Sequence, residues 1–154
     1  MRRVLTTTLL VLLVLALGVS PALAQSGHFV GKPTCRDMGT FVECTGKVAG
    51  LGGTTFTITV SAPGTADVEC TNPGGEVAPG QSFATTVTGT SGPFTTPRKG
   101  NARFTVRSDT PAAAPGSCPN PMWTARVVDV HFTTATLTLL EDGNVSDTIT
   151  VPVS

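Results

Sequence analysis

Short runs of alternating apolar and polar residues, separated by clusters of glycine and proline, constrain this chain more than any other feature of its sequence. In residues 54–60, Phe56, Ile58 and Val60 alternate with threonines. Successive side chains of a strand point to opposite faces, so this period of two predicts a strand with one buried face. Weaker or similar alternation recurs in four further runs: 83–87, 101–107, 127–132 and 134–139.

No stretch of the chain after its first 24 residues has the period of an amphipathic helix. The segments 135–141 and 145–151 are separated by Asp142-Gly143, a pair typical of a two-residue hairpin turn. Residues 25–154 contain 14 Val and 24 Thr but only four Leu, a composition that favours β-structure. We therefore predict an all-β chain, an immunoglobulin-like β-sandwich of about seven to nine antiparallel strands. A small β-barrel is the alternative.

The first 24 residues have the order of a secretory signal peptide. Two arginines precede an apolar run from Val4 to Val19, and small residues follow at Ala22-Leu23-Ala24. An N-terminal membrane anchor is the alternative, but the run is shorter than the roughly 20 apolar residues that a spanning helix needs. We expect cleavage before Gln25, a secreted extracellular protein without a membrane span, and a single domain over residues 25–154.

All four cysteines lie in the part expected to be secreted, at Cys35, Cys44, Cys70 and Cys118. An even number of cysteines on a secreted chain predicts two disulfides, and the absence of a Cys-x-x-Cys pair disfavours a zinc site. Three connectivities are open. We favour Cys35–Cys44, which closes a short hairpin-like loop, and Cys70–Cys118, which pins the proline-rich residues 109–122 to a strand.

The histidines bear on catalysis. His131 shares a strand face with Asp129, which supplies two members of a Ser/His/Asp set. A Gly-x-Ser-x-Gly nucleophile motif is absent, and His28 lies near the expected mature N-terminus. We predict no catalytic residues and no enzymatic activity.

Acidic residues gather at two places in the chain. Asp67 and Glu69 share a strand face, and Glu141, Asp142 and Asn144 crowd one turn. The Asp-x-Asp-x-Asp-Gly pattern of a calcium loop is absent. We therefore interpret these groups as a solvated face and a polar turn, and predict neither a metal nor a cofactor.

Charge excludes one class of partner and suggests another. Only 13% of the residues are charged and the net charge is zero, which disfavours a nucleic-acid binder. Arg103 and Arg107 share one strand face, where they are candidates to bind an anionic polymer of the cell envelope. The favoured alternative is that the basic residues pair with acidic strand residues such as Asp67 and Glu69. The basic cluster comprises Arg98, Lys99, Arg103 and Arg107.

The chain has one tryptophan and no tyrosine, which disfavours an aromatic platform for sugars. Trp123 follows the proline-rich residues 109–122. It is expected to pack against a disulfide in the core. The alternative is that Met122 and Trp123 form the lip of a small-molecule cleft.

Three stretches of the chain together carry a resemblance to a known group of proteins. They are Cys35-Arg-Asp-Met-Gly-Thr-Phe-Val-Glu-Cys44, Cys70-Thr-Asn-Pro-Gly-Gly75 and Cys118-Pro-Asn-Pro-Met-Trp123. With them the chain resembles a group of small secreted proteins, mostly actinobacterial, that carry no assigned function. The resemblance implies a bacterial host and an extracellular location, and it supplies no catalytic residues. Actinobacterial antibiotic carriers of the neocarzinostatin type are similar in architecture alone.

These observations predict a secreted, non-catalytic interaction module whose partner is an envelope polymer or an extracellular protein. The alternative is an extracellular small-molecule carrier with a cleft near Trp123.

Overall fold

The computed structural model describes residues 26–154, in which all regular structure is β-strand. The predicted signal peptide lies outside these residues. Seven of the strands described have six residues or more, and three are shorter. The strands are β1 (His28–Phe29), β2 (Thr34–Asp37), β3 (Val42–Ala49), β4 (Thr55–Thr71), β5 (Val77–Pro79), β6 (Phe83–Thr95), β7 (Ala102–Arg107), β8 (Thr124–Phe132), β9 (Thr134–Glu141) and β10 (Asn144–Pro152).

The smaller sheet, sheet A, is built around β3. Strand β7 pairs with one edge of β3, and β1 and β2 follow each other along the opposite edge, all antiparallel. Alternation along β3 turns Val42, Cys44 and Val48 inward and buries them, while Glu43, Thr45 and Lys47 face outward. Sheet A therefore has one apolar face and one polar face.

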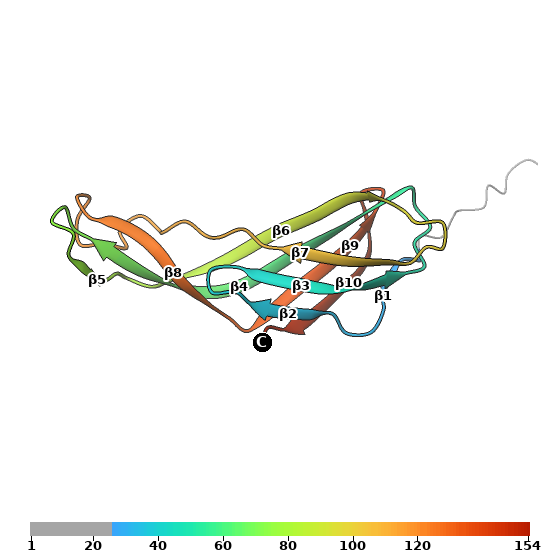
Figure 1. Ribbon diagram of the computed structural model, residues 1–154, viewed down its shortest axis with the longest axis horizontal. Helices are drawn as coiled ribbons and strands as arrows, with labels where there is room; N and C mark the ends of the chain where they lie inside the picture. Colours follow the sequence, from blue (N-terminus) through green and yellow to red (C-terminus); the bar gives the residue numbers. More distant parts are fainter. Residues whose placement is uncertain (1–25) are drawn as a thin grey trace, which may run out of the picture.

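The larger sheet, sheet B, is built around β4, which spans 17 residues. Strands β6 and β5 pair along one edge of β4, and β9 and β8 pair along the other. Strand β10 continues the sheet beyond β9. The molecule is elongated, and the distal half of β4 projects past sheet A together with β5 and β8 (Figure 1). We call this projecting part, residues 64–71 with β5 and β8, the extension.

The core lies where the two sheets face each other. Ile58, Leu137 and Leu139 of sheet B are fully buried, and Phe29 and Phe104 of sheet A meet edge to face, 5.7 Å between ring centroids. The prediction of an all-β fold with two antiparallel sheets is thus confirmed.

Both favoured disulfides are confirmed. Cys35 and Cys44 lie directly opposite each other in the β2–β3 pair, with their Cα atoms 4.1 Å apart. Cys70, in the extension, is joined to Cys118 in the loop between β7 and β8. The extension reaches beyond sheet A, so this loop covers the buried face of β4 there instead.

The predicted hairpin between β9 and β10 is present. Asp142 and Gly143 have φ angles of 47° and 83°, which a two-residue hairpin turn of type I′ requires. The Asp142 carboxylate accepts hydrogen bonds from the backbone amides of Thr54 and Thr55. These bonds hold the pKa of Asp142 below its usual value, and they tie the hairpin turn to the start of β4.

Glu141, the last residue of β9, is fully buried. Its carboxylate accepts hydrogen bonds from the amides of Gly27 at 3.0 Å, Gly52 at 2.7 Å and Gly53 at 3.2 Å. Ser146, the extra residue of a β-bulge in β10, donates its hydroxyl at 2.5 Å. Any side chain at Gly27 would collide with the carboxylate, because a Cβ there would lie 2.5 Å from its oxygen.

The protonation of Glu141 is therefore linked to folding. Burial raises the pKa of this carboxyl, but the hydrogen bonds from Ser146, Gly52, Gly53 and Gly27 outweigh burial and lower it below 4.5. The unfolded chain then binds the proton more readily than the folded chain. The stabilisation by Glu141 is complete above the ordinary pKa and is lost as the pH falls through the folded pKa.

We expect Glu141→Gln to lower the free energy of unfolding by about 2–4 kcal/mol at neutral pH, because a neutral amide replaces the buried carboxylate that accepts these four hydrogen bonds. Urea denaturation followed by circular dichroism measures this. The control is Glu76→Gln, an exposed turn residue whose oxygen accepts from Asn72 and is retained as an amide oxygen. The difference in the free energy of unfolding between the parent and Glu141→Gln should become smaller below pH 4.5. A difference that stays constant with pH would contradict the linkage between protonation of Glu141 and folding.

Candidate functional site

The outer face of sheet A gathers most of the positive charge found in residues 26–154. It holds five of the eight Lys and Arg residues in the described part of the chain and one carboxylate, that of Glu43. We call this surface the cationic face, and its basic residues are Lys32, Arg36, Lys47, Arg103 and Arg107.

At the centre of the cationic face two like charges lie side by side. Lys47 of β3 and Arg103 of β7 are direct cross-strand partners. Like charges placed opposite each other destabilise a sheet. Neither residue forms an ion pair with any residue from 26 to 154. With Lys32 they line an open hollow of about 550 Å³, to which Thr45 and Thr105 also contribute.

Arg107 is held differently from Arg103. Its guanidinium lies 2.6 Å from the Glu43 carboxylate and 5.0 Å from the centroid of the Phe41 ring. The two predicted binding arginines therefore share a face, but only Arg103 is unpaired within the described residues. Arg98 lies in the turn before β7 and is exposed, as is its neighbour Lys99.

The favoured interpretation, that the basic cluster pairs with acidic strand residues such as Asp67 and Glu69, holds within residues 26–154 only for Arg107, and its partner is Glu43 of β3. The Asp67 and Glu69 carboxylates lie on the extension, where Asp67 contacts His131 and Glu69 pairs with Arg126 at 3.1 Å. The register of β4 against β8 determines these partners, and β7 pairs with β3 instead.

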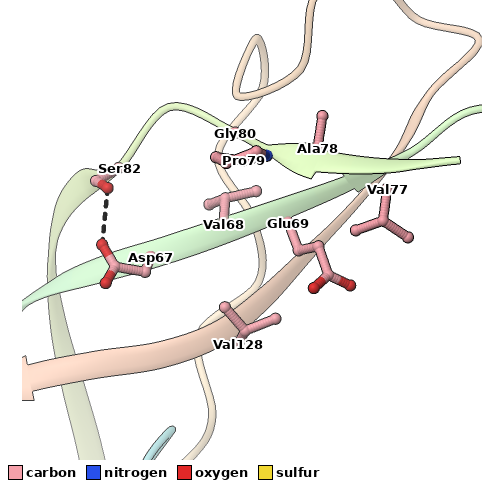
Figure 2. A pocket seen from close by; sticks show the side chains of 9 residues that line it. All are labelled: Asp67, Val68, Glu69, Val77, Ala78, Pro79, Gly80, Ser82 and Val128. Carbon is pink, nitrogen blue, oxygen red and sulfur yellow. Dashed lines mark hydrogen bonds between the residues drawn. The ribbon is translucent and has the colours of Figure 1, made fainter.

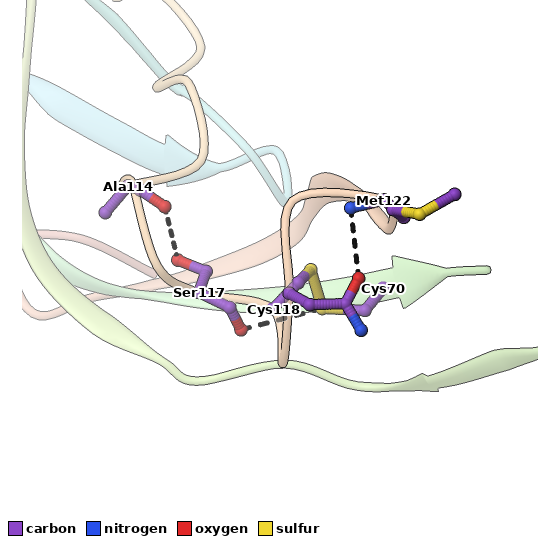
Figure 3. The surroundings of a disulfide bond; sticks show 6 residues. Cys70, Ala114, Ser117, Cys118 and Met122 are labelled. Carbon is purple, nitrogen blue, oxygen red and sulfur yellow. Dashed lines mark hydrogen bonds between the residues drawn. A yellow bond between two sulfur atoms is a disulfide. The ribbon is translucent and has the colours of Figure 1, made fainter.

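A second hollow, of about 680 Å³, lies in the loop between β7 and β8. Its wall is formed by prolines and alanines of this loop, by Cys118 and by the half-buried Trp123. The loop is held by the disulfide and by a hydrogen bond from the Ser117 hydroxyl to the Ala114 carbonyl (Figure 3). Trp123 thus lines a surface hollow and does not belong to the core between the sheets.

Met122, the other residue of the predicted cleft, does not line this hollow. It is 72% exposed, and its side chain points away from the disulfide in Figure 3. The amide of Met122 donates to the side-chain oxygen of Asn120, which fixes the turn before Trp123.

A third candidate lies on the outer face of the extension, where Asp67, Asp129 and His131 converge. The His131 Nε2 atom lies 2.9 Å from Asp67 Oδ2, and its Nδ1 atom lies 3.8 Å from Asp129 Oδ2. The hydrogen bond and the charge of Asp67, then the charges of Asp129 and Asp37, raise the pKa of His131. Hydrogen bonds from Ser82 and His131 in turn lower the pKa of Asp67.

Asp67 also borders a hollow of about 340 Å³ between β4, β5 and β8 (Figure 2). The exposed side chains of Val77 and Val128 lie beside it. Ser82 donates its hydroxyl to Asp67, not to His131. The order of contacts that a Ser/His/Asp nucleophile requires is therefore not formed by this serine.

No family model, curated protein sequence or solved structure matches the chain. Among residues 26–154, no helix has the length and hydropathy that a membrane crossing requires. The two disulfides indicate that the chain folds in an oxidising compartment.

Sequence reasoning missed Lys32, Arg36 and Lys47. They come before β4, far along the chain from Arg103, and only strand pairing brings them to one face. The alternation of Lys47 with the buried Val48 does carry a signal, because it places the lysine on the outer face of a strand.

Removing the disulfides tests how the loop hollow is maintained. We expect Cys70→Ala/Cys118→Ala to lower the free energy of unfolding by about 4 kcal/mol, and Cys35→Ala/Cys44→Ala by about 3 kcal/mol, because the first disulfide closes the longer loop. Trp123 is the only tryptophan. The Trp123 ring should become more accessible to acrylamide, which quenches its fluorescence, in Cys70→Ala/Cys118→Ala only. Equal quenching in both double variants would contradict the role of the Cys70–Cys118 disulfide in holding the loop.

Proposed function

We propose that this protein is a secreted, non-catalytic, immunoglobulin-like interaction module that binds an anionic polymer of the bacterial envelope through the cationic face. The observation that carries the proposal is the pair formed by Lys47 and Arg103. These side chains are adjacent, exposed and without an ion-pair partner among the described residues, which leaves an external anion to compensate them.

The spacing of the cationic face suits a linear polymer with repeated phosphate or carboxylate groups. Cross-strand neighbours such as Lys47 and Arg103 are about 5 Å apart. Arg103 and Arg107 are four residues apart on one strand, about 13 Å. Threonine hydroxyls at Thr45 and Thr105 lie between these charges and add hydrogen-bond donors. Arginine forks bind such oxygens in pairs.

Secretion is part of this proposal. It is supported by the order of charged, apolar and small residues in the first 24 positions and by the two disulfides. The resemblance to small secreted actinobacterial proteins supports a bacterial host. The net charge of the whole chain is zero, so attraction to a polyanion would be local to the cationic face.

The proposal is tested by removing single positive charges from the cationic face and, as a control, from the extension. We expect Arg103→Thr, and likewise Lys47→Thr, to weaken binding to an isolated anionic cell-wall fraction by about tenfold each, because each removes one contact to the polymer. Arg126→Thr removes the same charge from the extension and is the matched control. Threonine suits all three positions, because it is common in strands. Co-sedimentation at several salt concentrations measures the affinity.

Binding that is unaffected by Arg103→Thr and Lys47→Thr, or reduced equally by Arg126→Thr, would rule out the cationic face. Binding that does not weaken as the salt concentration rises would rule out charge as its basis.

The loop hollow favours a second candidate function, a small-molecule carrier. Its volume of about 680 Å³ falls in the range of drug-sized ligand sites, and proline, alanine and Trp123 give it an apolar wall. If a ligand occupies it, small apolar compounds should change Trp123 emission saturably, and Ala113→Arg should abolish the change. Emission that does not respond to any compound of a broad screen would count against the carrier.

A further inference from the structure

A β-bulge places Asp67 directly opposite Asp129. The β4–β8 pairing matches Asp67 with Asp129 but Val68 with Val127, so Val128 is the extra residue. Beyond the bulge, Glu69 is opposite Arg126. The bulge thereby keeps both pairs on the same outer face, since a one-residue shift moves a side chain to the opposite face of a sheet.

The two pairs have opposite electrostatics. Glu69 meets a cation, whereas Asp67 meets a second carboxylate, and like charges in this position destabilise a sheet. Within residues 26–154, neither Asp67 nor Asp129 forms an ion pair with a lysine or arginine. In the part of the chain that the structure describes, His131 is the one cationic group in ion-pair range of both carboxylates, and it is charged only when protonated.

The potential ligand atoms lie close together. One nitrogen of His131 and one carboxylate oxygen from each of Asp67 and Asp129 all fall within 4.8 Å of one another. Ligand atoms that share one tetrahedral ion at about 2.1 Å are about 3.4 Å apart. The three side chains are half-buried or exposed, so they have room to rotate toward that spacing.

We propose that Asp67, Asp129 and His131 form a binding site for a divalent transition-metal ion, with Zn²⁺ as the representative ion. The ion would supply a permanent positive charge between the two carboxylates, which His131 supplies only when it is protonated.

The ligand set favours such an ion over Ca²⁺ or Mg²⁺, because imidazole suits zinc and copper, whereas calcium and magnesium prefer oxygen ligands. Three protein ligands leave a fourth position for water. The Ser82 hydroxyl donates to Asp67 Oδ1 at 2.8 Å, which orients the carboxylate and leaves Oδ2 toward His131. A bound ion would crosslink β4 to β8 within the extension.

Calorimetric titration with Zn²⁺ alone, in a buffer that does not bind metals, tests the proposal on the purified, oxidised protein. We expect one Zn²⁺ per chain, with the affinity reduced at least about tenfold in Asp129→Asn and in His131→Gln. Two matched controls keep their affinity: Glu69→Gln changes the neighbouring carboxylate, and His28→Gln removes the only other histidine. The imidazole NMR signals of His131 should move during the titration.

The melting temperature of each metal-free variant shows whether the substitution disturbs folding. Without metal, Asp129→Asn should melt at the temperature of the parent or above it, because it removes one of two opposed negative charges. Failure of the parent to bind Zn²⁺ at sub-millimolar concentration would overturn the site. So would equal affinity in all four variants, or loss of binding in His28→Gln alone.

Discussion

The arrangement of the sandwich depends on one buried negative charge. The Glu141 carboxylate receives donors from the segment before β1, from the loop between β3 and β4, and from the bulge of β10. The first two segments belong to sheet A or lead from it, whereas Glu141 and Ser146 belong to sheet B. A single side chain therefore fastens the two sheets at one end of the molecule. A Cβ at Gly27 would lie 2.5 Å from the Glu141 carboxylate and a Cβ at Gly53 would lie 2.7 Å from the Asp142 carboxylate, so neither position has room for a side chain.

The second constraint is the length of β4. Its first half pairs with β9 and is covered by sheet A, and its second half pairs with β8 and is covered by the loop that carries Cys118. One strand thus runs through two differently built regions, and all three candidate sites are placed by this division. The cationic face lies on sheet A, the cluster of Asp67, Asp129 and His131 lies on the extension, and the loop hollow lies in the β7–β8 loop that covers the extension.

Local patterns predicted much of the fold. Alternation over 54–60 and 134–139 identified parts of β4 and β9, and Asp142-Gly143 identified the hairpin, because these features depend on neighbouring residues. Strand β4 is much longer than the run 54–60, because a Pro-Gly pair such as Pro63-Gly64 is typical of a turn and marks no strand in the sequence. Neither breaks the strand: both remain paired with β6, where Pro63 lies opposite Thr86 and Gly64 opposite Thr85.

The candidate sites were less accessible to sequence reasoning, because they depend on which strands pair. Asp129 and His131 were placed on one face correctly, but their meeting with Asp67 requires the β4–β8 register and its bulge. Glu141 was interpreted as part of a polar turn. Its burial could not be inferred, because its donors are backbone amides from distant segments, and such donors leave no trace in side-chain composition.

The distribution of charge has a consequence that the net charge conceals. The cationic face carries five basic residues and one carboxylate, whereas the extension and the turn beside it carry Asp67, Glu69, Glu76 and Asp129 with a single arginine. Glu141, Asp142 and Asp147 offset part of the positive charge at the sandwich end, but the outer face of sheet A stays positive and the extension stays negative, so the charge of a nearly neutral molecule is unevenly distributed. In the field of a charged surface such a molecule experiences a torque before contact, so it approaches with a preferred orientation.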